Sequence, residues 1–265
     1  MNPSEAKARV ARTYDTAADH FDHPALSFWQ LFGERSVARA APKTGERVLD
    51  VCCGTGASAI PAARAVGPTG SVLGIDLADS LLRLARAKSA DLANVEFRHA
   101  DFETEDLPEA NFDAVLCVFG LFFFPDMSAA LRKMRSMLKP GGRMVITTWG
   151  PGLFEPMNTV FWNAVRSERP DLHKNFNPWD TLTEPHLVRR VFEDADVPVD
   201  EVVAHRHQHP INGIADWWAI VLGSGYRATV EQLSEEARER VRTACARFAT
   251  TAPVQADVVY ALVRA

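Results

Sequence analysis

The sequence has few cysteines and neither a long apolar run nor a basic one, and each absence excludes a class of protein. Its four cysteines show neither zinc-finger spacing nor the spacing of a disulfide scaffold. No apolar run reaches the roughly 18 residues of a membrane span, and the polar start MNPSEAKARVARTYDTAADHFD has no signal-peptide core. A formal net charge of −5 argues against a nucleic-acid-binding surface. We therefore expect a soluble, cytoplasmic protein that binds no nucleic acid.

Between residues 47 and 149 short apolar runs alternate with stretches of helical periodicity. The runs cover 47–51, 71–76, 95–100, 112–119 and 143–149, and the clearest helical stretches are 80–90 and 129–138. Near-continuous apolar strands separated by helices predict a parallel sheet covered on both faces. Turn residues at 67–70 and 139–142 are expected to precede the second and fifth strands.

The flanking segments carry helices and two further strands. The pattern predicts helices before residue 45 and in 184–195 and 213–249, and strands at 199–209 and 257–263. We expect both strands to join the sheet. The fold would then be α/β, a Rossmann-like three-layer sandwich with a mostly parallel seven-stranded sheet and a helical lid. Its regions would be a lid segment (1–44), a core (45–150), and further lid helices with the last two strands (151–265).

The stretch VLDVCCGTGAS (48–58) is a strand followed by a glycine turn. Gly54 and Gly56 allow a tight turn and a close approach of backbone to ligand. With Ala59 they also satisfy the dinucleotide fingerprint of NAD enzymes. Asp50 favours another cofactor, because a carboxylate opposes an anionic pyrophosphate but suits the ammonium of S-adenosylmethionine (SAM). The alternative is that Asp50 only caps the turn.

Two more carboxylates follow the next strands. Asp76 lies 20 residues after Gly56, where an acidic residue can accept the hydroxyls of a ribose. NAD and SAM both contain a ribose, so Asp76 indicates a nucleoside without choosing between them. After the third strand, Asp101 and Phe102 would contact the adenine edge, unless Asp101 is an ordinary strand-end acid.

Five segments of the chain resemble the successive motifs of class I SAM-dependent methyltransferases. They are VLDVCCGTG (48–56), GSVLGIDLADSLLRLAR (70–86), RHADFETEDLP (98–108), FDAVLCVFGLFFFPD (112–126) and LKPGGRMVITTW (138–149). More narrowly, the chain is similar to the group that contains the quinone-biosynthesis C-methyltransferases and many small-molecule methyltransferases. The early YDTAADHFD (14–22) resembles the N-terminal segment of that group.

The resemblance implies that SAM is the cofactor and S-adenosylhomocysteine (SAH) the product. The cofactor-binding residues that it implies are Tyr14, Asp50, Cys53, Gly54, Thr55, Gly56, Asp76, Leu77, Leu81, Asp101, Phe102 and Cys117. In this assignment Tyr14 reaches the methionine carboxylate and the Cys117 carbonyl accepts the ammonium. Leu77 and Leu81 flank the adenine. One departure is Cys52, which stands where the family usually has Gly or another small residue.

Aromatic residues follow the fourth and fifth strands, at the edge of the sheet that faces the transferable methyl in this fold. Phe119, Phe122 and Trp149 could line an apolar substrate pocket, although Phe runs are more often plain core.

Histidines offer candidates for proton transfer. We consider His20 and His23 as general bases. His205, His207 and His209 alternate along one predicted strand and would share a face. They could bind a metal or move a proton, or could simply be solvated edge residues; we expect no metal.

The sequence therefore predicts methyl transfer from SAM to a small, largely apolar acceptor, aromatic or quinol-like, by in-line displacement. A general base is needed only if the acceptor must lose a proton. One alternative is an NAD(P)-dependent oxidoreductase, which fits the glycines but not Asp50. Another is a non-catalytic SAM-binding protein. We expect a monomer or homodimer, whose N-terminal helices are either a mobile lid or permanently docked.

Overall fold

A computed structural model of the chain describes residues 3–174 and 176–265. Residues 1, 2 and 175, which fall in the predicted lid segment and C-terminal region, lie outside the described residues. Within the described part, seven strands form one sheet in the order β3-β2-β1-β4-β5-β9-β6. They are β1 (Arg47–Val51), β2 (Ser71–Asp76), β3 (Val95–His99), β4 (Phe112–Val118), β5 (Leu138–Trp149), β6 (Glu201–His205) and β9 (Val258–Arg264). Strands β1 to β5 are joined by parallel pairings, and β9 runs antiparallel to both β5 and β6. The predicted Rossmann-like fold is confirmed.

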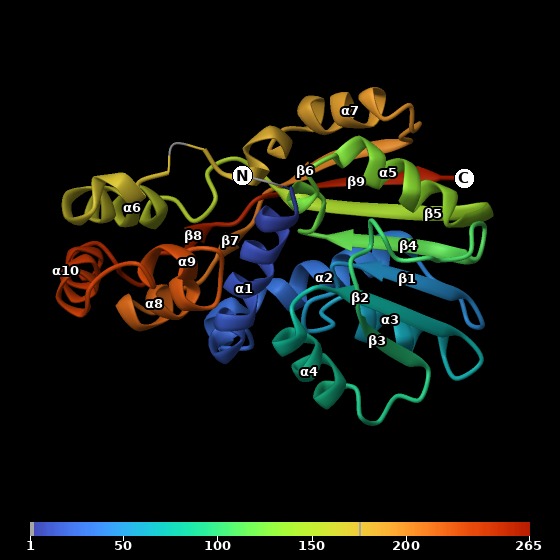
Figure 1. Ribbon diagram of the computed structural model, residues 1–265, viewed down its shortest axis with the longest axis horizontal. Helices are drawn as coiled ribbons and strands as arrows, with labels where there is room; N and C mark the ends of the chain where they lie inside the picture. Colours follow the sequence, from blue (N-terminus) through green and yellow to red (C-terminus); the bar gives the residue numbers. More distant parts are fainter. Residues whose placement is uncertain (1–2, 175) are drawn as a thin grey trace.

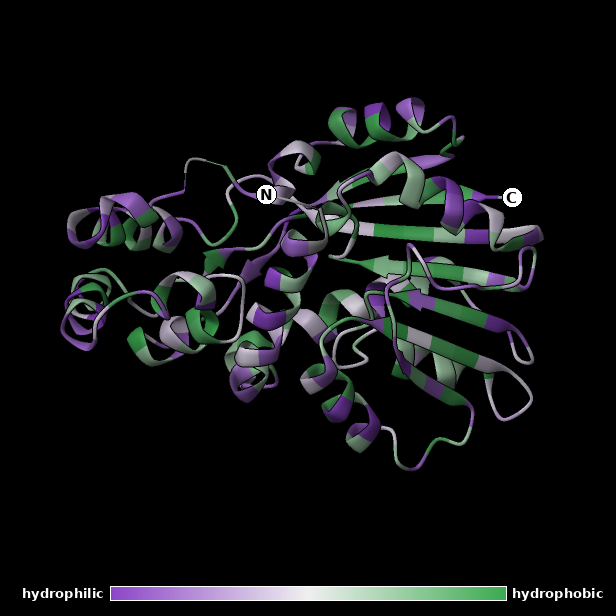
Figure 2. Cartoon of the chain, in the orientation of Figure 1, coloured by the Kyte–Doolittle hydropathy of each residue, from purple (hydrophilic) through white to green (hydrophobic). Residues whose placement is uncertain are grey.

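Helices cover both faces of this sheet. One face packs against α2 (Phe28–Ala40), α3 (Ala59–Val66) and α4 (Asp79–Lys88), and the other against α5 (Met127–Ser136) and α7 (Pro185–Asp194) (Figure 1). Figure 2 shows the apolar colouring concentrated on the central strands, while α7 alternates between polar and apolar residues. Strands of this kind are apolar on both sides because neither side faces water.

The remaining helices lie beyond one end of the strands. Figure 1 shows α1 (Pro3–Phe21) between the sheet and a group made of α6 (Met157–Glu168), α8 (Ile214–Leu222), α9 (Arg227–Val230) and α10 (Glu235–Ala246). Helix α1 packs against α4, α8 and α9. Short 3₁₀ turns occur at Pro24–Leu26 (η1), Leu121–Phe123 (η2), Pro170–Leu172 (η3) and Pro178–Leu182 (η4). Among the described residues, no helix has the length and apolar character needed to cross a membrane.

The strand predicted over 199–209 is in fact two strands in different sheets. Strand β6 ends at His205, and β7 (Gln208–His209) pairs with β8 (Val254–Gln255) in a separate two-stranded sheet. The backbone N–H of His207 donates to the Asp257 carboxylate at 2.9 Å, which interrupts the ladder. His205 is consequently exposed, whereas His209 is buried and bonded to the Ala25 carbonyl at 2.8 Å.

The three histidine side chains nevertheless share a face, as expected, because all of them lie toward α2. The His207 ring is edge-on to Phe32 and the His209 ring to Phe28, with centroids 5.3 Å and 4.9 Å apart. Burial, together with Arg35 and Arg39 of the same helix, lowers the pKa of His205.

The turn expected at 139–142 lies inside a strand. Strand β5 already begins at Leu138, and its pairing with β4 shifts register between Phe112 and Ala114. Gly141 has a φ of +79°, and its N–H donates to the Ala265 carbonyl at 2.8 Å. The glycines thus form an irregularity in the strand, and the C-terminal residue provides its hydrogen-bond partner.

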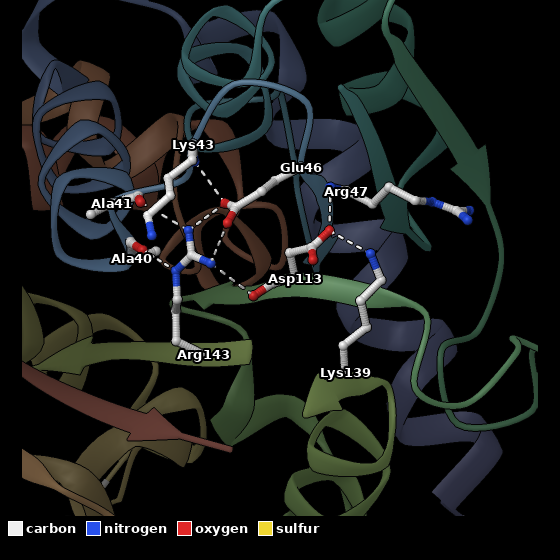
Figure 3. A network of polar contacts seen from close by, with 8 residues as sticks. All are labelled: Ala40, Ala41, Lys43, Glu46, Arg47, Asp113, Lys139 and Arg143. Atoms are coloured by element: carbon white, nitrogen blue, oxygen red, sulfur yellow. Dashed lines mark hydrogen bonds and ion pairs between the residues drawn. The ribbon is translucent and has the colours of Figure 1, made fainter. Parts of the chain in front are cut away.

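A polar network joins the amino ends of the central strands (Figure 3). Arg143 of β5 donates to the carbonyls of Ala40 and Ala41 at the end of α2 and to the Glu46 carboxylate. It also reaches the carbonyl of Asp113, whose carboxylate accepts the Arg47 N–H at 2.8 Å and the Lys139 ammonium at 2.7 Å. One guanidinium therefore connects a helix end with three strands.

Candidate active site

A cavity opens at the carboxyl ends of the parallel strands, the edge at which α/β folds bind ligands. Its walls come from α1, from the loops after β1, β2, β3 and β4, and from Trp149 at the end of β5. Its empty space is about 1090 Å³ when the open mouth is included.

The glycine loop forms one wall of the cavity. Cys52, Gly54 and Gly56 have φ angles of +59°, +52° and +81°, so the chain turns sharply as it leaves β1. Gly54 borders the cavity. Gly56 does not; a Cβ there would lie 3.0 Å from the Ile60 side chain, so this glycine serves the packing of the loop onto α3. The two glycines that the sequence singled out therefore have different roles.

Asp76 is fixed at the floor of the cavity. One of its carboxylate oxygens accepts the Gly54 N–H and the other the Ala78 N–H, each at 2.8 Å. Burial raises the pKa of Asp76, against the effect of these two hydrogen bonds. A carboxylate has about four acceptor positions, so Asp76 keeps capacity for hydroxyl donors of a ligand.

Asp50 does not border the cavity, contrary to the role expected for it. Its side chain is fully buried, and one oxygen accepts the Ser58 hydroxyl at 2.7 Å. Its other oxygen has no partner within the described part of the chain. Burial raises the pKa of Asp50 to about 7, in spite of the Ser58 bond. Cys117 is likewise fully buried and lies behind the cavity wall.

Most of the other predicted cofactor residues do meet at the cavity. The bordering ones are Tyr14, Cys53, Gly54, Thr55, Asp76, Leu77, Leu81, Asp101 and Phe102. Tyr14 extends from α1, its ring lies edge-on to Phe123 with centroids 5.6 Å apart, and burial raises its pKa. Lys7 of α1 also borders the cavity and pairs with Asp101 at 2.7 Å. Sequence reasoning missed Lys7, because no local pattern links two residues 94 positions apart.

The far part of the cavity is aromatic. Phe119 and Trp149 stack with centroids 3.9 Å apart and planes 17° apart. Trp29 packs against both rings and stacks on Phe21, with centroids 5.1 Å apart. The predicted substrate residues Phe119, Phe122 and Trp149 all border the cavity, together with Phe21 and Trp29, which the sequence placed only in the lid segment.

The two histidines considered as general bases lie elsewhere. His20 Nδ1 is 2.8 Å from the Asp19 carboxylate, and the exposed His23 accepts the Ala25 N–H at 3.1 Å as the cap of η1. Among the described residues that border the cavity there is no histidine. The structure therefore does not support proton transfer by His20 or His23. No group of three or more metal-ligating side chains occurs among the described residues either.

Comparison with known proteins agrees with the class that this fold and cavity define. Residues 48–142 match the family described as a methyltransferase domain. The chain is 36% identical over 193 residues to the aklanonic acid methyltransferase DauC of Streptomyces sp. (strain C5), covering 68% of this chain and 88% of that protein. It is 35% identical over 166 residues to a demethylmenaquinone methyltransferase of Staphylococcus aureus, covering 60% and 69%.

Two solved structures share the fold at low sequence identity. A putative methyltransferase of Bacillus halodurans C-125 superposes with a TM-score of 0.57 at 20% identity, over 88% of this chain and 97% of that chain. A phospholethanolamine N-methyltransferase 2 of Haemonchus contortus gives 0.60 at 17% identity, over 97% and 59%. The protein belongs to the class I SAM-dependent methyltransferases, within the group related to quinone methyltransferases. SAM is its cofactor.

The residues at the cavity fit this cofactor. Asp76 has spare acceptor capacity for the two hydroxyls of a ribose. Leu77 and Leu81 give the same end of the cavity apolar walls, and Gly54 allows a ligand to approach the backbone closely.

Proposed function

We propose that this methyltransferase acts on a small, largely apolar acceptor, aromatic or quinol-like. The observation that carries the proposal is the aromatic end of the cavity, where Phe119, Trp149 and Trp29 pack together. Aromatic walls bury large apolar area and favour offset or edge-to-face contact with flat rings. The names of the two relatives add support, because one contains an organic acid and the other a quinone.

The cofactor residues take distinct parts in this proposal. Asp76 accepts the ribose hydroxyls, and Leu77 and Leu81 flank the adenine. Asp101 and Phe102 meet the adenine edge. Cys53, Gly54 and Thr55 lie along the methionine part, and Tyr14 closes over its carboxylate. We also keep, as a proposal, the division into a lid segment (1–44), a cofactor-binding core (45–150) and a C-terminal region (151–265).

The chain's own contribution to the chemistry is placement and exclusion of water. SAM supplies a methyl group that its sulfonium has already activated. For an in-line displacement the protein must hold the acceptor about 3–3.5 Å from that methyl and keep water away. The walls around Phe119 and Trp149 serve both purposes. With no histidine among the described lining residues, an aromatic hydroxyl that ionises readily fits best as the acceptor.

Transfer of labelled methyl from SAM to hydroquinones, phenols and aliphatic amines of similar size tests this function. We expect turnover with the aromatic acceptors, and a fall in kcat/KM of at least about tenfold in Trp149→Ala, since a large buried aromatic wall is lost. SAH affinity should change little. Phe248→Ala is the matched control, because Phe248 is 60% exposed and outside the cavity. Turnover confined to amines, or equal kinetics in both variants, would contradict the proposal.

A further inference from the structure

Two cysteines from neighbouring strands lie close together beside the cavity. Cys52 directly follows β1, is half-buried and borders the cavity, whereas Cys117 belongs to β4 and is fully buried. Val51 is the register partner of Cys117, so Cys52 lies one residue beyond that pair. Neighbouring strands are about 4.8 Å apart, and a disulfide accepts Cα separations of about 4.4–6.8 Å. The backbone therefore allows a bridge between these two residues.

The two side chains converge on Gly120. A Cβ at Gly120 would lie 2.8 Å from the Sγ atom of Cys117 and 2.9 Å from that of Cys52, so both sulfur atoms lie around one point. Both thiols are free. A hydrogen bond with Cys117, together with burial, raises the pKa of Cys52 well above its ordinary value. Cys53 is directed elsewhere, because its Sγ atom lies against Gly74 of β2.

Cys52 also has an unusual backbone conformation. Its φ of +59° lies in the left-handed region, which few residues other than glycine adopt without strain. This conformation places Cys52 at the start of the glycine loop. The proposed function gives its thiol no part in binding the cofactor or the acceptor. A reactive pair with Cys117 would give this thiol a role.

We propose that Cys52 and Cys117 form a modification site, which a peroxide oxidises to a reversible disulfide in the SAM-free chain, and that this disulfide weakens SAM binding. A peroxide small enough to enter the cavity reaches Cys52 there. The effect on SAM rests on the proposed function, which places the methionine part of the cofactor along the glycine loop.

The oxidation balances with hydrogen peroxide as the oxidant. The Cys52 thiolate attacks one peroxide oxygen, the O–O bond breaks, and a sulfenic acid and one water form. The Cys117 sulfur then displaces the hydroxyl group, which leaves as a second water with the Cys117 proton, and the S–S bond forms. The two thiols together lose two electrons. Because the raised pKa leaves little Cys52 thiolate near neutral pH, the first step is slow.

The glycine loop must move when the bond forms, because the sulfur atoms have to approach to about 2.05 Å. Cys117 is held in the sheet by its pairing with Val51 on one side and Ile146 on the other. Cys52 lies outside the strands, so the displacement falls mainly on the loop that it begins. Gly54, whose N–H donates to Asp76, is two residues further along this loop. Because the coupling is reciprocal, bound SAM opposes the disulfide by the factor by which the disulfide weakens SAM.

Peptide mapping by mass spectrometry after treatment with hydrogen peroxide tests the bond. We expect a reducible cross-link between the peptides that contain Cys52 and Cys117. SAH at about ten times its dissociation constant should slow its formation about tenfold, since only the free chain reacts. Absence of this cross-link, or a bond between Cys52 and Cys53 in its place, would refute the pair. An equal rate with and without SAH would refute the link to the cofactor.

Two cysteine variants locate the reacting sulfur atoms. Cys117→Ser should give no cross-link and should leave Cys52 as a sulfenic acid, which a sulfenic-acid reagent labels. Cys245→Ser is the matched control, because Cys245 is a buried cysteine of α10 that does not border the cavity. It should form the cross-link at the wild-type rate. A cross-link that persists in Cys117→Ser, or disappears in Cys245→Ser, would overturn the assignment.

Calorimetric titration with SAH measures the consequence of the bond. Peroxide-treated wild type should bind SAH about five- to tenfold more weakly, and dithiothreitol should restore the affinity. Cys52→Ser, compared before and after the same treatment, should show no change, because one sulfur is missing. Unchanged affinity in cross-linked wild type would refute the effect on SAM, and an equal loss in Cys52→Ser would assign the loss to oxidation elsewhere.

Methyl transfer by the fully reduced chain separates this inference from the proposed function. If the reduced chain methylates hydroquinones or phenols but peroxide forms no cross-link, the cysteine pair alone is wrong. If the cross-link forms and the reduced chain methylates only amines, the proposed acceptor class alone is wrong.

Discussion

Replacement of Asp50 by Asn should make the protein more stable relative to wild type as the pH rises. The Asp50 carboxyl is fully buried, and its pKa is raised from 3.8 to about 7. The folded state therefore keeps a proton between about pH 4 and pH 7 that the unfolded state has already lost. Folding stability falls as the pH rises through this window and levels off above it, because ionisation of the buried carboxyl then costs its full amount.

The size of the effect follows from the shift. Three pKa units at about 1.36 kcal/mol each give a total penalty of about 4 kcal/mol in wild type at high pH. The amide in the Asp50→Asn variant would not ionise and would still accept the Ser58 hydroxyl through its oxygen. The stability gap between this variant and wild type should therefore widen by about 2–3 kcal/mol from pH 5 to pH 7. Titration of groups remote from Asp50 is common to both proteins and cancels in the difference. The charge of Asp76 contributes to the raised pKa of Asp50, so this coupling is part of the measured gap.

Urea unfolding followed by tryptophan fluorescence over this pH range measures the gap. The exposed Asp194→Asn is the control, because it removes a carboxylate of the same type without burial. A gap of constant size between Asp50→Asn and wild type would show that Asp50 ionises normally, and the argument from its burial would be wrong.

Three further outcomes test the cofactor site. Gly54→Val places a β-branched residue at a φ of +52° and should abolish SAH binding in calorimetry. Phe102→Ala should only weaken SAH binding. Equal effects of the two substitutions would mean that the glycine loop does not lie where the cofactor binds. Asp76→Ala should weaken SAH at least tenfold, since hydrogen bonds to a charged group contribute about 1.5–3 kcal/mol; unchanged affinity rules out the assignment. His20→Ala and His23→Ala should keep wild-type kcat and KM, because neither side chain borders the cavity. A large fall in kcat in either variant would show that this histidine takes part in catalysis.

The fold was predictable where local pattern and tertiary environment agree. Strands such as β1 and β4 are covered on both faces, so the burial that defines them is visible as an apolar run. The prediction of strand boundaries failed where a backbone group has its hydrogen-bond partner far away in the sequence. The break after His205 depends on Asp257, and the strand character of 139–142 depends on Ala265, which accepts the Gly141 N–H.

The site was predictable to the same extent. Gly54 and Asp76 act through the turn in which they lie, so spacing alone located them at the cavity. The direction of the Asp50 side chain was not visible in the sequence. Ser58, which itself borders the cavity, donates to that carboxylate, and Asp50 stays behind the wall. No sequence pattern around Lys7 indicates a role, because Lys7 reaches the cavity and Asp101 only when α1 packs against the loop after β3.

Because of the Arg143 network, the two edges of the sheet differ in how well they tolerate amino-acid substitutions. At the amino edge the Arg143 guanidinium joins the end of α2, β4 and the start of β1. A substitution at one of these places therefore disturbs the hydrogen bonds at the others. At the carboxyl edge the aromatic and polar walls come from separate loops. Loops can diverge while the scaffold beneath them stays constant. New acceptors are therefore accessible to this fold through changes at the carboxyl edge, while the opposite edge keeps the strands in register.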